Sequence, residues 1–273
     1  MKADLHVHTN ISDCNLSPEE VIKEAVKNDL KAISLTDHDT LESLKVSPLL
    51  EKYYDIEIVP GLEISAYDYE LNRKCHILGY YVKPNKEIFD FTQQILKKRH
   101  NNSLKQIENL KKHGYKITIE EVLKVSGETI YKQHIMHILI KKGYAREVIG
   151  AKYYELFKND GICSQSIKYP SMIDAIILIK NAGGLPVLAH PTLYGNLPSV
   201  SKMVEAGLMG IEGSYPTLMK NDFKIIKEIA NKYGLIITGG SDYHGFYGED
   251  LNNYVGKHYV EDIIVKKMKN RLK

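Results

Sequence analysis

Two histidines, His6 and His8, stand two residues apart in the segment DLHVHT, residues 4–9. Side chains at positions i and i+2 of a β-strand point to the same side, so on a strand the two imidazoles would converge on one point. Imidazole is a common ligand of transition metals, but a histidine pair can also decorate an exposed strand. The rest of the chain has to decide between these two interpretations.

Further histidines and carboxylates follow the predicted strands at the points where the strands end, which is where parallel α/β barrels carry their chemistry. Asp242 and His244 repeat the two-residue spacing of the first pair. A lone histidine such as His76 is more often a hydrogen-bonded core residue than a ligand. A set of six imidazoles and three carboxylates is harder to dismiss, and it favours divalent transition metals held by nitrogen and oxygen. The set comprises His6, His8, Asp13, His38, Glu63, His76, His190, Asp242 and His244.

Short apolar segments, which we interpret as buried strands, alternate with helical patterns along most of the chain. The segments are residues 3–7, 32–35, 56–59, 76–82, 185–189, 209–211 and 235–238. Between the first two, SPEEVIKEAVKN predicts a helix with Ser17 as N-cap, Pro18 at the first helical position and Glu20 closing a capping box. Strands that alternate with helices lie parallel, so the pattern predicts an α/β fold that closes naturally into a barrel.

Residues 86–169 break this alternation, because they show helical patterns and no convincing strand. One long amphipathic helix is predicted to end at Gly114, and shorter helices are predicted to stop at Gly127 and Gly143. We therefore expect a metal-binding barrel of residues 1–85 and 170–273, with residues 86–169 inserted as a helical lid over one end.

The composition is ordinary for a globular protein of 273 residues, with 43% hydrophobic and 26% charged residues. A net charge of +3 gives no case for a protein that coats nucleic acid. No apolar run approaches the roughly 20 residues that span a bilayer, and the first residues lack a signal-peptide core. Three cysteines without a CxxC spacing argue against a disulfide framework. We expect a cytoplasmic protein with no membrane contact and no obligate protein partner.

The motifs DLHVHT…SD, TDHD, PGLEIS, LGYYV, LAHP and GSDYHG resemble, in this order, those of the PHP (polymerase and histidinol phosphatase) family of metal-dependent phosphoesterases. The resemblance implies a distorted, TIM-like (β/α)7 barrel with two or three divalent metal ions, which are manganese, zinc or iron. By position it implies a first metal held by His6, His8, Glu63 and Asp242, a second held by Glu63, His76 and His190, and a third held by Asp13, His38 and His244.

The helical insertion resembles that of the PHP branch acting on nucleoside 3′,5′-bisphosphates and on short RNA or DNA 5′ ends. That branch carries a TRGHF-like segment, and YKQHI, residues 131–135, stands in its place here. His134 matches, whereas Lys132 replaces the arginine and so offers a point charge instead of a bidentate fork. Asp13 stands where other PHP branches have histidine. We expect Arg99, Lys132 and His134 to hold substrate phosphates, although a solvated or structural role is at least as common for each.

The resemblance predicts a metal-dependent phosphoesterase that acts on nucleoside 3′,5′-bisphosphates or short 5′-phosphorylated oligonucleotides by attack of a metal-bound hydroxide. Its catalytic residues would be Glu63, Asp13 and His244. Three divalent cations and three carboxylates leave a charge of about +3, which suits a phosphate substrate. The alternatives are a histidinol-phosphate phosphatase, a carbon–nitrogen amidohydrolase and a non-catalytic metal-binding accessory protein. Amidohydrolases commonly use a carbamylated lysine, and no strand-end lysine here suits that role.

Overall fold

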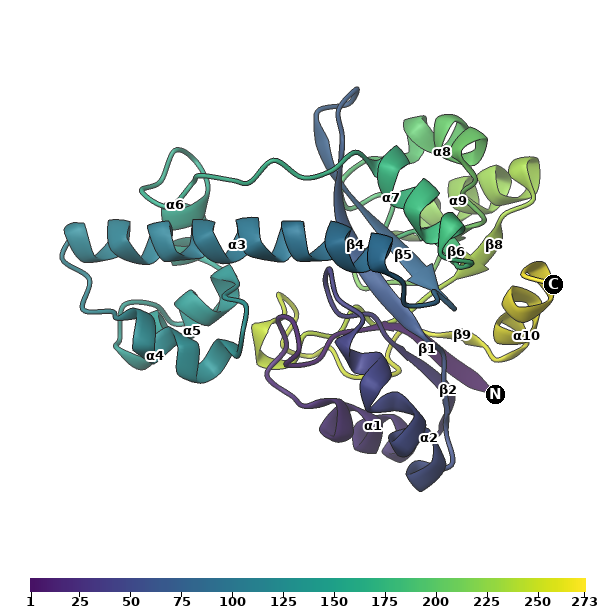
Figure 1. Ribbon diagram of the computed structural model, residues 1–273, viewed down its shortest axis with the longest axis horizontal. Coiled ribbons are helices and arrows are strands. Elements are labelled where there is room, and N and C mark those ends of the chain that lie inside the picture. The colour runs from purple at the N-terminus through teal and green to yellow at the C-terminus, as the bar shows by residue number, and fades with distance from the viewer.

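The computed structural model describes residues 1–273 and shows an α/β fold built on two sheets (Figure 1). The first sheet has the strand order β3-β2-β1-β9, with β1 (Lys2–Val7), β2 (Leu30–Leu35), β3 (Glu57–Ile58) and β9 (Val260–Glu261). The second has the order β4-β5-β6-β7-β8, with β4 (Gly61–Asp68), β5 (Arg73–Tyr80), β6 (Leu185–Leu188), β7 (Gly210–Glu212) and β8 (Ile236–Thr238). The predicted α/β class is confirmed.

Closure into a (β/α)7 barrel is not confirmed, because the strands form two separate sheets. Single bridges link the sheets, from Val7 to Tyr243 and from His38 to Glu63. The expectation of parallel strands is wrong for β5, which is antiparallel to both β4 and β6. Only residues 69–72 connect β4 to β5, and so short a connection permits antiparallel pairing alone, since a parallel pair needs a crossover of about a dozen residues.

Helices flank both sheets in Figure 1, with α1 and α2 beside β1 and β2, and α7, α8 and α9 beside the second sheet. Their bounds are α1 (Pro18–Lys27), α2 (Ser47–Tyr54), α7 (Met172–Asn181), α8 (Val200–Ala206), α9 (Lys220–Tyr233) and α10 (Ile263–Arg271). Helix α1 begins with the predicted capping box, in which the Ser17 hydroxyl accepts from the Glu20 backbone N–H and the Glu20 carboxylate accepts from that of Ser17. No helix has the length and apolar character needed to cross a membrane.

The largest hydrophobic core lies between the second sheet and the helices α7 to α9. It contains Leu62 and Ile64 of β4, Ile77 of β5, Ile176 of α7 and Ile226 of α9, all fully buried. Burial of such side chains is the main favourable term in folding, about 1.5–3 kcal/mol for each one removed from water. This core fixes the positions of β4 and β5, the two strands that carry Glu63 and His76.

Residues 86–169 contain α3 (Lys86–Lys112), α4 (Ile119–Ser126), α5 (Lys132–Lys141) and α6 (Ala151–Phe157), and no strand. Gly114 and Gly143 follow α3 and α5 with positive φ angles of 85° and 77°, as expected of glycines after helix ends. Figure 1 shows α3 running from the sheets out to α4, α5 and α6. These helices share a core of their own, with Ile107, Ile135 and Leu139 at its centre. That they form a separate domain and a lid stays a prediction.

Candidate metal centre

The structure brings the nine predicted ligand side chains together at one end of the two sheets. Their donor atoms form three groups, each with all atoms within 4.8 Å of one another. The groups are His6, His8, Glu63 and Asp242; His8, Asp13, His38 and His244; and His38, Glu63 and His76. The ninth residue, His190, places Nε2 3.1 Å from Glu63 Oε1. The first group equals the set expected for the first metal, and the others overlap with the remaining two sets.

Glu63 lies at the centre of the cluster. Its Oε1 atom lies 2.9 Å from His76 Nδ1 and 3.1 Å from His190 Nε2. Its Oε2 atom lies 3.1 Å from His38 Nδ1, 3.3 Å from His8 Nε2 and 3.4 Å from His6 Nε2. One buried carboxylate thus contacts five imidazoles. The sequence placed Glu63 in a loop after a strand, whereas it is the third residue of β4.

The first group has the dimensions of a metal site. Five of the six distances between its donor atoms are 3.3–3.4 Å. The donor atoms are His6 Nε2, His8 Nε2, Glu63 Oε2 and Asp242 Oδ1. A tetrahedron with such edges has a centre about 2 Å from every corner, which is the length of a zinc–nitrogen or zinc–oxygen bond. In addition, Asp13 Oδ1 and His38 Nδ1 are buried, and neither forms a well-oriented hydrogen bond with its neighbours. Converging lone pairs of this kind fit a divalent cation.

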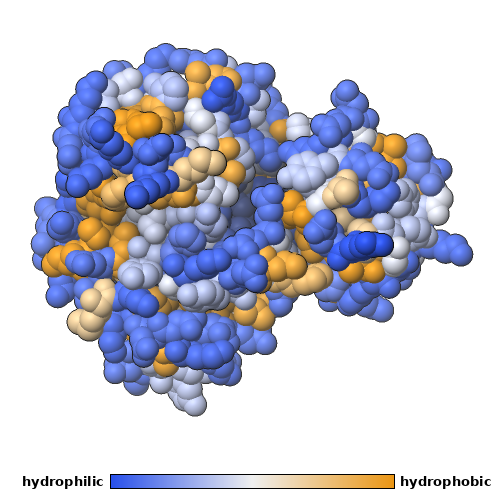
Figure 2. Space-filling model, turned by 180° about the vertical axis from the view of Figure 1, so that it is seen from behind, coloured by the Kyte–Doolittle hydropathy of each residue, from blue (hydrophilic) through white to orange (hydrophobic).

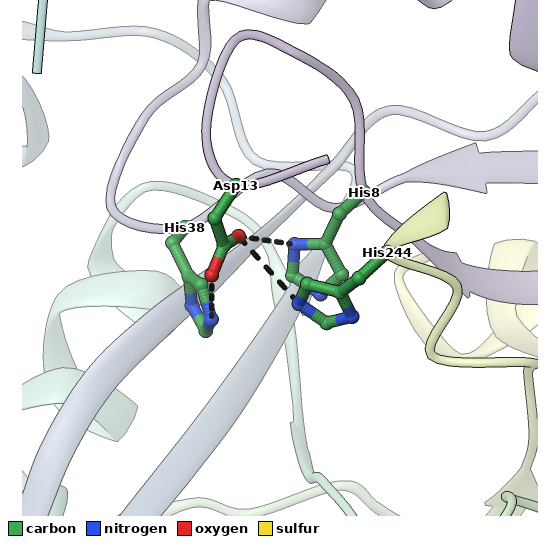
Figure 3. A group of neighbouring side chains, drawn as sticks. All are labelled: His8, Asp13, His38 and His244. Carbon is green, nitrogen blue, oxygen red and sulfur yellow. Dashed lines mark ion pairs between the residues drawn. The ribbon is translucent and has the colours of Figure 1, made fainter. Parts of the chain in front are cut away.

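Asp13 is the carboxylate of the second group, and Figure 3 shows three imidazoles around it. Its Oδ1 atom lies 3.5 Å from His244 Nε2 and 3.8 Å from His8 Nδ1, and Oδ2 lies 3.9 Å from His38 Nε2. Asp13 comes from the loop after β1, and His244 from the loop after β8. The group therefore joins the two sheets.

Backbone contacts hold these segments in place. The His8 N–H donates to the Tyr243 carbonyl at 3.0 Å, and the Asp242 N–H donates to the His6 carbonyl at 2.8 Å. Asp242 and His190 have positive φ angles of 46° and 26°, which are uncommon for residues other than glycine. The loop after β1 is held by Asp37, which accepts from the backbone N–H of Thr9 at 2.8 Å and from the Ser12 hydroxyl at 2.7 Å.

Two residues that the sequence did not single out contact the cluster. Glu212, at the end of β7, lies 3.1 Å from His6 Nδ1 and accepts from the His190 backbone N–H at 2.7 Å. The rule that found the other carboxylates, a polar residue at the end of a predicted strand, also points to Glu212. Gln133 donates to Asp13 Oδ2 at 2.9 Å. It lies between Lys132 and His134 in YKQHI, and no sequence signal distinguishes it.

Charge coupling within the cluster shifts several pKa values. Burial opposes ionisation of Asp13, but His244, His38 and His8 together lower its pKa to about 2. Burial would also lower the pKa of His8, yet hydrogen bonds with Asp242 and Glu63 raise it to about 10. Without a metal, the carboxylates are therefore ionised and balanced by protonated imidazole.

Two adjoining cavities open onto the cluster. The first, of about 540 Å³, is lined by seven of the nine residues: Asp13, His38, Glu63, His76, His190, Asp242 and His244. The second, of about 850 Å³, shares Asp13, His38 and His76 and extends toward α3, α5 and α6. Figure 2 shows the surface hollowed where the smaller lobe adjoins the larger body. A substrate in the first cavity therefore has room to continue into the second.

Arg99 and Lys132 line the second cavity, but Arg99 is already engaged. Its Nη2 atom donates to Asp39 Oδ2 and Ser65 Oγ, at 2.8 Å each, and its guanidinium lies 4.7 Å from the Tyr131 ring centre. Lys132 forms no ion pair. Burial, together with Lys158 and Arg99, lowers its pKa to about 8.

His134 is not brought to either cavity. Its ring is fully buried, and its Nδ1 atom accepts from the Tyr131 backbone N–H at 3.1 Å. This local bond at the start of α5 turns the ring inward, where it packs edge-on against Tyr247. Burial lowers the pKa of His134 to about 4, so the ring is neutral. A direct contact with a substrate phosphate is inconsistent with this position.

Comparison with known proteins supplies the family. The PHP domain model matches residues 4–237. A phosphoribosyl 1,2-cyclic phosphate 1,2-diphosphodiesterase from Eggerthella lenta is 37% identical over 251 residues, which cover 91% of this chain and 96% of the relative. The chain belongs to the PHP family, and it is an enzyme, a metal-dependent phosphoesterase. The predicted family and enzyme class are confirmed.

Two further relatives are each 26% identical to the chain. The 5′-3′ exoribonuclease Rnm of Escherichia coli aligns over 88% of this chain and 84% of its own length. The 3′,5′-nucleoside bisphosphate phosphatase of Chromobacterium violaceum aligns over 92% and 90%. Among solved structures, one described as a metal-dependent phosphoesterase from Bifidobacterium adolescentis superimposes with a TM-score of 0.90 at 24% identity, covering 98% of this chain and 96% of the other. That likeness shows the fold.

Proposed function

We propose that the nine clustered residues hold two or three divalent metal ions, and that the enzyme hydrolyses a phosphate ester of a ribose that carries a second phosphate. The observation that carries the proposal is the contact of one buried carboxylate, Glu63, with five imidazoles beside an open cavity. Mixed nitrogen and oxygen ligands suit manganese, zinc and iron.

The substrate class follows from what the relatives have in common. The names of the Eggerthella and Chromobacterium relatives specify a phosphoribosyl cyclic phosphate and a nucleoside bisphosphate, and the Escherichia relative acts on RNA. Each of these substrates is a ribose bearing at least two phosphate groups. We infer a substrate of the same kind, either a nucleoside 3′,5′-bisphosphate or a short 5′-phosphorylated oligonucleotide.

A ribose cyclic phosphate is the second candidate. It is supported by the 37% identity to the Eggerthella diphosphodiesterase, compared with 26% to each of the other two. The same cluster suits both reactions, because each is an attack of water on phosphorus that breaks one phosphorus–ester oxygen bond. A monoester then releases phosphate and an alcohol, whereas a cyclic diester opens to a monoester that stays on the ribose.

Bound divalent metals polarise a phosphoryl oxygen and lower the pKa of water, which supplies the nucleophile. The chain's own residues prepare the site for them. His6 Nδ1 lies 3.1 Å from Glu212 Oε1, and His244 Nδ1 lies 2.8 Å from the Asp242 carbonyl oxygen. An acceptor at Nδ1 keeps the ring proton there, so the Nε2 lone pair of each ring faces the cluster, as ligation requires.

The proposed catalytic residues are Glu63, Asp13 and His244, since all three belong to the cluster and also line the first cavity. Glu63 fixes the relative positions of the imidazoles. The Gln133 amide donates to Asp13 and so orients its carboxylate. Residues 86–169 are proposed to be a lid domain that closes over this face, because the second cavity reaches α3, α5 and α6.

The test is a comparison of kcat/KM on the manganese-loaded enzyme. Substrates are adenosine 3′,5′-bisphosphate, a short 5′-phosphorylated RNA, a ribose 1,2-cyclic phosphate that carries a 5-phosphate, adenosine 5′-monophosphate and histidinol phosphate. We expect the substrates with two phosphates to exceed the monophosphate by roughly 10-fold or more, the value of one good charged hydrogen bond. A preference for histidinol phosphate would overturn the substrate class, and failure to hydrolyse any of them with any divalent metal would overturn the proposed centre.

A further inference from the structure

We propose that Lys74, Lys132 and Lys158 together bind the second phosphate of the substrate, the one that is not hydrolysed. This inference rests on the proposed function, because it assigns the two phosphates of one substrate to two places in the same cavity system.

The three lysines reach the second cavity from separate parts of the chain. Lys74 lies in β5, Lys132 is the first residue of α5, and Lys158 directly follows α6. All three are half-buried, and none forms an ion pair with a carboxylate. By contrast, Lys202 on the surface is paired with Glu70. Three ammonium groups that face one cavity repel one another unless an anion lies between them.

The remaining charges around the cavity do not cancel the lysines. Arg99, which is held by Asp39, and the exposed Arg73 add two further cations. Of the acidic residues that line the cavity, Asp13 belongs to the metal cluster, while Asp160 and Glu249 are exposed and pair with no lysine. Lys158 and Arg99 contribute to lowering the pKa of Lys132 to about 8, after the larger effect of burial. The lysines are therefore close enough to sense each other's charge.

The spacing along β5 fits a ribose with two phosphates. Lys74 and His76 are two residues apart on one strand, so they point to the same side and lie roughly 7 Å apart along it. This is about the span of a ribose ring with its two phosphate esters. A phosphate at the metal cluster near His76 would leave the other beside Lys74, and Lys132 and Lys158 reach the same space from the lid.

As the group that the lysine cluster binds, a phosphate fits better than a carboxylate or a nucleobase. Lys is a compact point charge with three donors and a common phosphate ligand, and three of them more than balance the charge of about −2 on a phosphate monoester. Lys132 is further held by the Phe157 ring, whose centre lies 5.4 Å from its Nζ atom. The bound group is therefore a terminal phosphate, which a ribose cyclic phosphate with a free 5-phosphate would supply as well as a nucleotide.

The first measurement uses binding alone. Adenosine 3′,5′-bisphosphate is titrated into the full-length protein stripped of metal with a chelator. We expect Lys132→Met and Lys158→Met each to weaken binding roughly 10-fold, the cost of one charged contact. Lys202→Met, which removes a surface lysine, is the matched control and is expected to bind like the unmodified protein. Equal binding by all four proteins would overturn the proposal.

The second measurement separates the lysine site from the metal centre. On the manganese-loaded enzyme, the ratio of kcat/KM for adenosine 3′,5′-bisphosphate to that for p-nitrophenyl phosphate should fall roughly 10-fold in each variant, through KM. An unchanged ratio would contradict the proposal, even if both activities decline. If the enzyme hydrolyses neither compound, the proposed function fails, while the titration of metal-free protein still decides whether the lysines bind phosphate.

Discussion

Glu63 is the central carboxylate of the proposed metal centre. Its two carboxylate oxygens lie between 2.9 and 3.4 Å from nitrogens of five imidazoles. The three histidines His38, His76 and His6 hold the pKa of this carboxyl well below its usual range against the opposing effect of burial. No other carboxylate of the cluster contacts so many imidazoles, since Asp13 and Asp242 each contact three. Removing its charge should therefore disturb the whole centre.

Glu63→Gln preserves the volume of the side chain and removes one negative charge. We expect the metal content of the purified protein to drop, and kcat to fall by more than the roughly 10–100-fold that loss of an outer partner of a metal ligand costs. Metal analysis, kinetics and circular dichroism check this. The exposed Glu205→Gln is the control. If Glu63→Gln keeps the metal content and the turnover of the unmodified protein, Glu63 is not central to the metal centre.

Proton release should accompany metal binding at His8. Neighbouring carboxylates raise the pKa of this buried ring to about 10, so the metal-free protein carries a proton there at neutral pH. Because only the neutral ring can bind a metal, apparent affinity should rise as the pH increases from about 7 to about 9. Calorimetric titration with Mn²⁺ in buffers of different ionisation enthalpy measures the released protons. Binding without any proton exchange would refute this.

The raised pKa of His8 has the opposite pH dependence for the stability of the metal-free protein. A raised pKa in the folded state means that His8 contributes stability below pH 6.5, its ordinary value, and that this contribution is lost as the pH approaches 10. The lowered pKa of Asp13, about 2 instead of 3.8, adds stability above its ordinary value that is lost in acid. Metal-free protein should therefore lose thermal stability on the alkaline side of neutrality, while its affinity for metal increases.

Residue types and spacing predicted which nine side chains lie together, because most of them follow a strand of one of the two sheets. They did not reveal that Glu212 and Gln133 contact the cluster. Glu212 contacts His6 across 206 positions of sequence, and Gln133 contacts Asp13 across 120. Such contacts depend on how the loops fold, which no local pattern specifies.

At the scale of elements, β5 explains why His76 belongs to the site although it stands near the beginning of its strand. The strand runs opposite to its neighbours, so its first half lies at the edge where β6 ends. The Ala189 N–H, just after β6, donates to the His76 carbonyl at 3.1 Å and places His76 beside His190. A sequence of strands and helices does not show that one strand is reversed, because the alternation of apolar residues is the same in both directions.

Helix α3 is attached to the sheets through Arg99. Asp39 is fully buried, and the Arg99 guanidinium is its charged partner at 2.8 Å. Arg99→Ala should therefore lower the free energy of unfolding by about 3–5 kcal/mol, the usual cost of leaving one charge of a buried pair alone. Denaturant unfolding measures the change. Arg146→Ala, at an exposed position, should stay within about 0.5 kcal/mol of the unmodified protein.

A double variant tests whether the pair itself is responsible. Asp39→Asn removes the charge that Arg99→Ala leaves uncompensated, so the two changes together should cost less than the sum of the single changes. Additive losses would show that Arg99 stabilises α3 through its packing on Tyr131 and Tyr169 and not through the ion pair.

At the scale of the whole molecule, residues of the sheets and of the helical region 86–169 line the two cavities, and the surface is hollowed between the two lobes (Figure 2). The sequence predicted the helical region and its place in the chain, since glycines mark the helix ends. It did not predict that the strands divide into two sheets, because sheet closure depends on strand pairing between distant segments. The proposed metal ligands come from both sheets, so the centre itself joins them.

The central claim, that these nine residues hold metal ions, is tested most directly by anomalous diffraction from crystals of the metal-loaded enzyme. Data collected on both sides of the manganese, iron and zinc absorption edges locate each metal and identify its element. We expect two or three anomalous peaks, all within the cluster around Glu63, and we expect the nine residues to be the only protein ligands of these metals. A stoichiometrically loaded, active enzyme with no peak in this cluster, or with its peaks elsewhere in the molecule, would contradict it.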